Sequence, residues 1–361
     1  MYLIRLVMPF LLGISMGALF TAVLQADERF GASSFAPIMF NVGSIAIMAI
    51  WPGDPTALGL SAAVGGLLQA LVQLPYLKGF RLEWKRHPAF GEALRRMGPF
   101  TFTTGLRQIL NLVLVNVLTR YPTGATNAFY NAEVIYLMVL GLLSTSPAMA
   151  LYPRMADQQN NSEALGNLLE RVFVLMGLAG GLLAALAPWV VGALYAFSAN
   201  FTPENRLYSA QTLTAMGFAV LPWGINTFLL RGFYAVGEVA RAVQVSVVIL
   251  VLNAAGYWLL RDAGLFALNL STAVAGLIGL LIYAARLERL YILSLRWLLE
   301  FSGRVILAAI PSGLAAFLVA RFFGFPGYFL HNLPPLLAGG LVGLAVFVVA
   351  ARLLKLPLRL R

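Results

Sequence analysis

The sequence predicts an all-α polytopic membrane protein with about 11 transmembrane helices. Of its 361 residues, 60% are hydrophobic and only 11% are charged, whereas soluble domains carry about a quarter charged residues. The mean hydropathy is +0.83. The apolar residues form continuous runs of roughly 20, the length of a spanning helix, and do not alternate as the strands of a membrane barrel would.

Eleven such runs follow one another along the chain. The first lacks a small-x-small cleavage site, so we interpret it as a span and not as a signal peptide. The connections are short, which leaves no room for an extramembrane domain, and the longest and most charged connection is about 80–97. The predicted spans are residues 3–25, 34–52, 57–79, 98–119, 127–151, 167–197, 208–230, 239–260, 264–285, 302–322 and 332–353.

The basic residues predict an orientation for these spans. If Met1 lies outside, 19 of the 25 Lys and Arg residues fall on the cytoplasmic side, five fall outside and Arg107 lies inside a span. Cytoplasmic loops of membrane proteins carry such an excess of Lys and Arg. The net charge of +11 is therefore interpreted as a topology signal and not as a nucleic-acid footprint, and the basic face would attract anionic membrane lipids.

Two ionisable residues, Arg107 and Glu133, fall deep in consecutive antiparallel spans. An unpaired charge at the centre of a span costs at least ~2.5 kcal/mol. With a rise of about 1.5 Å per residue, the two side chains differ in depth by about 6 Å. They therefore either form an internal ion pair or contact a charged substrate in a cavity, and we select both as candidate substrate-binding residues.

Amide side chains at membrane depth add further candidates. Gln69 and Gln73 lie four residues apart on one helix face, and they either line a wet cavity or hydrogen-bond between helices. The preceding Gly65 and Gly66 would allow close approach of a neighbouring helix. The other candidate substrate-binding residues are Gln108, Asn111 and Asn41.

Several function classes are disfavoured by what the sequence lacks. It contains no cysteine and only two histidines, His87 and His331, so thiolate chemistry and a histidine-rich metal site are not expected. A Walker A loop for ATP is also absent. No loop carries the paired acidic residues of a metal-dependent glycosyltransferase, so we do not expect an enzyme.

Four stretches, in order, resemble the MurJ/MviN family of lipid II flippases. "RLVMPFLLGISMGALFTAVLQADERFGASSFAPIMFNVGSI" is similar to the fourth helix, its loop and the start of the fifth helix. "GGLLQALVQLPYLKG" resembles the sixth helix, and "ATNAFYNAEVIYLMVLGLLSTSPAMALYPRMA" resembles the eighth. "LLRGFYAVGEVARAVQVSVVILVLN" resembles the exit of the tenth helix, a polar turn and the eleventh helix.

The resemblance implies a two-lobed flippase-type bundle with two extra C-terminal helices. It implies a partial N-terminal lobe at residues 1–97, a six-helix C-terminal lobe at 98–296, and a pair of helices at 297–361 that forms a lipid-tail groove. The matched loop and turn motifs suggest a cytoplasmic gating role for four residues, which are Arg29, Arg231, Tyr234 and Glu238.

The implied function is transport of lipid II, the undecaprenyl-diphosphate-linked peptidoglycan precursor, across the bacterial cytoplasmic membrane by alternating access. Membrane lipids are further partners. No cofactor is expected, and a monovalent cation or the membrane potential would supply the energy.

Two departures from the family pattern are visible. The family's first three helices have no counterpart here. We therefore expect a truncated gene product, half of a split gene completed by a separately encoded N-terminal helical segment, or a divergent paralogue. "FYNAE" places Glu133 where the family has arginine. The alternatives are a flippase for another polyprenyl-linked glycan, and a truncated non-transporting membrane subunit.

Overall fold

Helices account for every regular element in the residues that the computed structural model describes. These residues are 2–27, 29–77, 79, 88, 90–145, 162–197, 201–235, 238–288, 294–325 and 327–357. The chain divides into two compact units, Met1–Pro88 and Ala89–Arg361. Each unit is described by itself below.

The first unit is a three-helix bundle in which α3 packs against both of the other helices. Asp54 caps the start of α3, because its side chain accepts a hydrogen bond of 2.8 Å from the Thr56 amide. The described elements of this unit are α1 (Tyr2–Ala26), α2 (Phe30–Ile50), α3 (Pro55–Leu71) and a short 3-10 helix (Leu74–Tyr76).

Glycines bring the backbones of this bundle together. A Cβ atom on Gly65 would lie 2.7 Å from the carbonyl oxygen of Phe40 in α2, and one on Gly66 would lie 2.9 Å from the ring of Phe10 in α1. Two adjacent glycines therefore let α3 approach a different neighbour on each side, as small residues do in membrane bundles. This confirms the close helix approach that the sequence predicts for Gly65 and Gly66.

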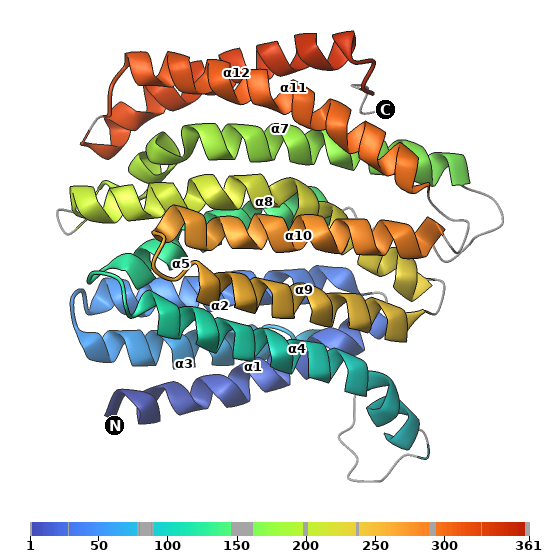
Figure 1. The fold of residues 1–361 in the computed structure, drawn as a ribbon. Coiled ribbons are helices and arrows are strands. Elements are labelled where there is room, and N and C mark those ends of the chain that lie inside the picture. The colour runs from blue at the N-terminus through green and yellow to red at the C-terminus, as the bar shows by residue number, and fades with distance from the viewer. Residues whose placement is uncertain are drawn as a thin grey trace. The chain divides into compact units, whose positions relative to one another are not determined.

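The second unit is built around α8 (Pro203–Ala235), which packs against α5, α7 and α10. Leu213, Val220 and Ile225 of this helix are fully buried. Outside this centre, α9 packs on α4 and α10, and α11 packs on α7 and α12, as Figure 1 shows. The other elements are α4 (Phe90–Leu118), α5 (Ala125–Leu140) with a π-helical turn (Gly141–Thr145), α7 (Ser162–Tyr195), α9 (Val239–Leu259), α10 (Leu265–Glu288), α11 (Leu295–Phe322), a 3-10 helix (Phe329–Asn332) and α12 (Leu333–Leu353).

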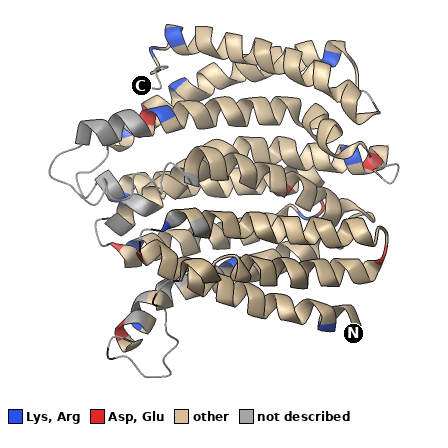
Figure 2. Ribbon diagram, turned by 180° about the vertical axis from the view of Figure 1, so that it is seen from behind, with Lys and Arg blue, Asp and Glu red and all other residues tan. Residues whose placement is uncertain are grey.

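The predicted spans correspond to these helices. Ten of the described helices are long and apolar enough to cross a membrane, and α4 contains a shorter apolar segment, Gly105–Leu118. This confirms the all-helical polytopic class. In Figure 2, the Lys and Arg positions lie mostly near helix ends, which fits a bilayer around the apolar middle of each helix. The orientation of the termini stays a prediction.

Helices extend beyond the apolar runs at three places. The connection predicted at 80–97 is shorter, because α4 begins at Phe90 and takes in Glu92 and Arg95. Likewise, α11 begins at Leu295 and not near 302, after Ser294 caps its first turn. Charges end an apolar run without ending a helix, because Glu, Arg and Leu are all good helix formers.

The third place is the polar turn near residue 235. The sequence places the exit from the span at about residue 230, but α8 remains helical through Ala235, and α9 starts at Val239. Three residues therefore separate the two helices, and the structure describes the last of them. That residue, Glu238, donates its backbone N–H to the Phe233 carbonyl over 2.9 Å.

The three predicted domains stay predictions, since the compact units follow a different division. The boundary between the units lies at Pro88, ahead of the predicted limit at residue 97. Residues of the predicted six-helix lobe and of the C-terminal pair both belong to the second unit, where α11 lies against α7.

Candidate functional site

Arg107 lies on an exposed face of the apolar segment of α4. The buried residues of this helix, Leu114, Val117 and Leu118, belong to the core of the second unit, while the side chains of Arg107, Gln108 and Asn111 are exposed. Arg107 and Asn111 are four residues apart and so share a face. The structure thus places three of the predicted substrate-binding residues together on α4.

Glu133 lies on α5 and is half-buried. The helix that carries it follows α4 directly in the chain, and the predicted proximity of Glu133 to Arg107 stays a prediction. Within the described part of the chain, however, neither residue forms an ion pair within 4.0 Å. The Arg107 side chain is exposed, and that of Glu133 is partly exposed.

A polar cluster lies in the core near these two charges. Tyr136 of α5 lies three residues after Glu133 on the same helix and is buried, as is Tyr257 of α9. The Tyr136 hydroxyl is buried and has no hydrogen-bond partner among the described residues. A buried hydroxyl normally has a partner, so its position marks a place where water or a ligand atom would be stabilised.

Tyr257 joins this cluster to the next helix. Its hydroxyl lies 2.9 Å from the Thr272 hydroxyl, which donates to the Asn253 side-chain oxygen over 3.3 Å. The Trp223 indole donates to the Thr272 carbonyl over 2.8 Å. Sequence reasoning missed Tyr136 and Tyr257 as site residues. In a hydrophobic span, the sequence alone does not distinguish such a tyrosine from an ordinary core residue.

Gln73 is buried in the first unit and tied to its neighbours. Its side-chain amide donates to the carbonyls of Gly17 (3.1 Å) and Gln69 (3.0 Å), and its oxygen accepts from the Thr21 hydroxyl (3.0 Å). These bonds join α3 to α1, which matches the interhelical alternative for this residue. Gln69 is half-buried and Asn41 of α2 is exposed.

The predicted cytoplasmic residues lie at helix ends. Arg29 directly precedes α2 and donates to the Tyr76 carbonyl over 2.9 Å, which ties the α1–α2 connection to the end of α3. Glu238 precedes α9 and pairs with Arg241 at 3.0 Å. Arg231 and Tyr234 lie in the last turns of α8, and their side chains fall outside the described part of the structure.

An apolar groove of about 450 Å³ crosses the second unit between α7, α8 and α11. Its lining includes glycines at which these helices approach one another closely, among them Gly180 and Gly181 of α7, Gly217 of α8 and Gly313 of α11. Phe218 and Phe317 contribute aromatic walls. Of the two C-terminal helices predicted to form a lipid-tail groove, α11 supplies lining residues.

The described residues contain no group of three or more His, Cys, Asp or Glu side chains placed to hold a metal ion. The candidate site comprises the guanidinium of Arg107, the carboxyl group of Glu133, and nearby amides and hydroxyls.

The sequence of the chain matches that of known proteins. Residues 1–335 match the family model described as "Lipid II flippase MurJ". The lipid II flippase MurJ of Burkholderia cenocepacia is 27% identical over 340 residues, covering 88% of this chain and 66% of the relative. A probable lipid II flippase MurJ of Rickettsia prowazekii is 23% identical, covering 98% of this chain and 73% of the relative.

Two solved structures share the fold. A lipid II flippase MurJ in an inward closed conformation aligns with a TM-score of 0.78 and 19% identity over 98% of this chain and 75% of that one. The Vibrio cholerae MATE transporter VcmN in the bent form aligns with a TM-score of 0.53 and 17% identity, over 78% and 70% of the two chains.

The chain thus spans about two thirds of the length of its Burkholderia relative. The match to the family model covers most of the present chain. Ten candidate spans and this match make it a multi-pass protein of the inner membrane. The chain belongs to the MurJ family of lipid II flippases.

Proposed function

We propose that this chain moves lipid II, the undecaprenyl-diphosphate-linked peptidoglycan precursor, from the inner to the outer leaflet by alternating access. The observation that carries the proposal is the exposed Arg107 side chain within the apolar segment Gly105–Leu118, in a chain that belongs to this family. A cation at that depth is costly in hydrocarbon, so it is expected to face water or a partner.

The diphosphate group is the chemistry that Arg107 would serve. A diphosphate does not cross about 30 Å of hydrocarbon unaided, because its charges would lose their solvation. A guanidinium presents a planar fork of N–H donors that matches phosphate oxygens. Gln108 and Asn111 would add neutral donors to the glycan or phosphate, and Glu133 would keep the guanidinium in place between transport events.

The polyprenyl tail requires a different surface. The groove between α7, α8 and α11 is lined almost entirely by apolar residues, so a prenyl chain would lie in it while the head group is at Arg107. Transport of this kind makes no covalent bond and needs no bound cofactor. The energy would come from a monovalent-cation gradient or from the membrane potential, with Met1 outside and the C-terminus in the cytoplasm.

Reconstitution tests the proposal. The purified chain is inserted into liposomes that contain lipid II, and a membrane-impermeant hydrolase added outside measures how much head group reaches the outer leaflet. Parallel liposomes contain a polyprenyl-diphosphate lipid with an unrelated glycan. We expect lipid II to be exposed faster than in empty liposomes, and Arg107→Ala to abolish the difference.

Two outcomes would count against the proposal. Folded protein that exposes neither lipid would contradict transport by this chain. Exposure of the unrelated glycan lipid alone would replace lipid II by another polyprenyl-linked glycan. Applying and then collapsing a sodium gradient or a membrane potential in the same liposomes would identify the energy source.

A further inference from the structure

Helix α8 carries a buried proline, Pro222, inside its length. A proline within a helix has no N–H to give to the carbonyl four residues earlier, and sharp bends of helices are found mostly at such positions. The residues on the two sides of Pro222 are held by different neighbours. We call residues 203–221 the first part of α8 and residues 223–235 the second part.

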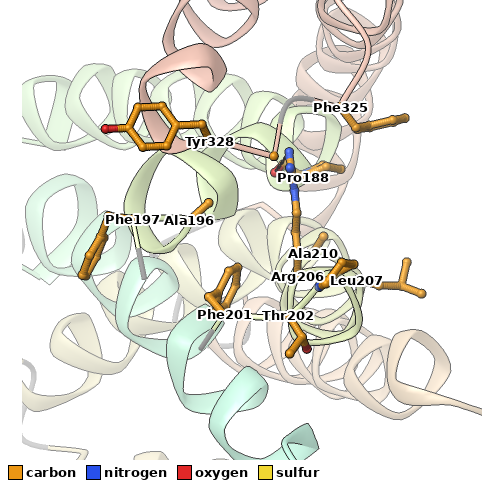
Figure 3. Close-up of a pocket in the computed structure, with 12 residues that line it drawn as sticks. Pro188, Ala196, Phe197, Phe201, Thr202, Arg206, Leu207, Ala210, Phe325 and Tyr328 are labelled. Carbon is orange, nitrogen blue, oxygen red and sulfur yellow. Dashed lines mark hydrogen bonds between the residues drawn. The ribbon is translucent and has the colours of Figure 1, made fainter. Parts of the chain in front are cut away.

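The start of the first part is bonded to α7. Arg206 donates to the carbonyl of Pro188 in α7 over 3.1 Å and to the Asn332 side-chain oxygen over 2.7 Å. A Cβ atom on Gly192 of α7 would lie 2.8 Å from Arg206 Nη2, so this glycine makes room for the arginine. Figure 3 shows Arg206 in the wall of a cavity of about 700 Å³. The arginine therefore ties the first part of α8 to α7.

Farther along, α7 contacts the two parts of α8 in different ways. Before Pro222 the two backbones meet, because a Cβ atom on Gly217 would lie 2.6 Å from the backbone nitrogen of Ala184. After Pro222, the nearest atom to a Cβ atom on Gly224 would be the sulfur of Met176, at 2.6 Å. A methionine side chain is flexible and adapts its shape to its surroundings. The contact of α7 with the second part can therefore adjust, whereas its contact with the first part cannot.

Two side chains tie the second part of α8 to α10. The Trp223 indole donates to the Thr272 carbonyl over 2.8 Å, and the buried Asn226 amide donates to the Gly276 carbonyl over 2.8 Å. A Cβ atom on Gly276 would lie 2.7 Å from the Trp223 ring, so the two helices are also in close contact here. The second part of α8 is thus fixed to this stretch of α10.

The first part of α8 is tied to α10 less firmly. There the Asn269 amide lies 3.4 Å from the Thr212 hydroxyl, and it also donates to the Leu265 carbonyl of its own helix over 2.8 Å. The bond between the helices is the longer and weaker of these two.

Helix α5 is interrupted at the same level as α8, by its π-helical turn Gly141–Thr145. Such turns are rare and are frequent at functional sites. Ser144 of this turn is fully buried and donates to the Gly224 carbonyl over 2.6 Å. Before the turn, α5 is bonded to α7 instead, because the Tyr195 hydroxyl donates to the Asn131 carbonyl over 3.0 Å. The π-helical turn therefore separates residues bonded to α7 from a residue bonded to the second part of α8.

We propose that Pro222 and the π-helical turn of α5 form one hinge, and that Ser144 is a positioning residue that makes this turn follow the second part of α8. On one side of the hinge, α7, the first part of α8 and Ala125–Leu140 of α5 stay together. On the other side, the second part of α8, the π-helical turn and the adjoining turns of α10 move as one body. Both helices bend where their regular hydrogen bonding is already interrupted.

The hinge would connect this movement with the candidate site. Glu133 lies on the part of α5 that stays with α7. Thr272, which accepts from the second part of α8, also shares a hydrogen bond with Tyr257 of α9, and α9 packs on α4, which carries Arg107. The movement would therefore change the separation of Arg107 and Glu133. This inference rests on the transport function proposed above and adds the place at which the second unit bends.

Distances between spin labels on introduced cysteines test the hinge in the whole chain, which has no cysteine of its own. Both label pairs include Leu207 in the first part of α8. The partner is Leu281 of α10, beyond Gly276, in one pair and Leu137 of α5 in the other, and all three leucines are exposed. In nanodiscs, addition of lipid II should shift the Leu207–Leu281 distance by about 2 Å or more. The Leu207–Leu137 distance should not change.

Pro222→Ala separates a hinge from a structural role, because its two expected effects have opposite signs. Alanine restores the missing N–H and is favoured in a helix, so the melting temperature should rise or stay the same. The distance shift should disappear, and lipid II exposure per folded molecule should fall about tenfold. Pro311→Ala is the matched control, because Pro311 lies inside α11 at an exposed position. It should leave transport at the wild-type level.

Ser144→Ala tests the link between the two helices. It removes the bond to the Gly224 carbonyl, and transport per folded molecule should fall about fivefold. Ser144→Cys keeps a weak donor of similar size and should restore part of the rate. Thr227→Ala is the matched control, because the Thr227 hydroxyl also donates to a backbone carbonyl, that of Trp223, but within α8. Its transport should equal that of the wild type.

Three results would count against the hinge. An unchanged Leu207–Leu281 distance in the wild type, or an equal change in both distances, would overturn it, and so would wild-type transport by the Pro222→Ala protein. A loss of transport in Ser144→Ala that Ser144→Cys does not relieve would remove the positioning role of Ser144. A wild-type chain that exposes no lipid II would contradict the proposed function, and the distances would still decide whether the hinge exists.

Discussion

A Cβ atom placed on Gly13 of α1 would lie 2.4 Å from the carbonyl carbon of Gly66 in α3, so the two backbones touch at this point. Neither glycine has a side chain that could change rotamer to relieve the contact. The position of α1 on α3 therefore depends on two glycines that are 53 residues apart in the sequence. Close backbone approach of this kind is a main source of helix association in membranes, where hydrophobic burial gives little.

Gly13→Leu should destabilise the first unit. Overpacking of a tight contact typically costs about 1–3 kcal/mol, and here the obstacle is a backbone that cannot rotate away. Gly31→Leu is the control, since nothing lies within 4 Å of a Cβ atom at Gly31. The measurement is the melting temperature of the detergent-purified protein. Equal melting temperatures for the two variants would show that α1 and α3 do not meet at Gly13.

Gln73→Leu should lower stability without changing transport per folded molecule. The substitution removes three side-chain hydrogen bonds, two of them to α1 and one to Gln69 of α3. It also leaves the buried carbonyl of Gly17 without this donor, which costs roughly 1–3 kcal/mol. Asn41→Leu, at an exposed position of the same unit, should leave the melting temperature unchanged. A stable Gln73→Leu protein with lost transport would instead make Gln73 a substrate contact.

Arg107→Ala should fold normally and lose transport. The side chain is exposed and forms no close ion pair in the described residues, so its removal should change the unfolding free energy by less than about 1 kcal/mol. Arg120→Ala removes another exposed arginine just after α4 and should retain transport. Normal lipid II exposure by the Arg107→Ala protein would remove this residue from the mechanism.

The charge swap Arg107→Glu with Glu133→Arg should retain expression and part of the transport rate. The swap keeps the summed charge of the two positions and places an arginine at residue 133, where the resemblance to the family implies one. Each single reversal places two like charges at the site and should abolish transport. Wild-type transport after both residues are changed to Leu would show that neither matters.

Tyr257→Phe and Tyr136→Phe should differ in their effect on stability. The Tyr257 hydroxyl shares a hydrogen bond with Thr272, and its loss should cost about 1 kcal/mol. The Tyr136 hydroxyl is buried without a partner in the described residues, so Tyr136→Phe should be neutral or slightly stabilising. If Tyr136→Phe lowers the melting temperature or the transport rate, an ordered water or ligand atom occupies that position.

Single cysteines in this cysteine-free chain would determine its orientation. Thr123→Cys lies in the α4–α5 connection, and Arg296→Cys lies at the exposed start of α11. An impermeant thiol reagent added to intact spheroplasts should label the first protein, and it should label the second only after permeabilisation. The reverse pattern would place Met1 in the cytoplasm.

Local sequence determined the helices and the family of this protein. In lipid, a run of about 20 apolar residues must form all its backbone hydrogen bonds within the protein, and only a helix does so within one segment. Each predicted span therefore contains a helix among the described residues. Ordered motifs such as Arg-Gly-Phe-Tyr-Ala at residues 231–235 were sufficient to suggest the family, which the family model then confirmed.

Only the tertiary structure decided which side chains meet. Tyr257 and Thr272 lie on α9 and α10, and the cavity around Arg206 needs a glycine on α7, an arginine on α8 and an asparagine before α12. Helix periodicity fixes which residues of one helix share a face, but it says nothing about the partner opposite that face. The partner is set by backbone contacts such as that between Gly13 and Gly66, whose sequence signal is only the absence of a side chain.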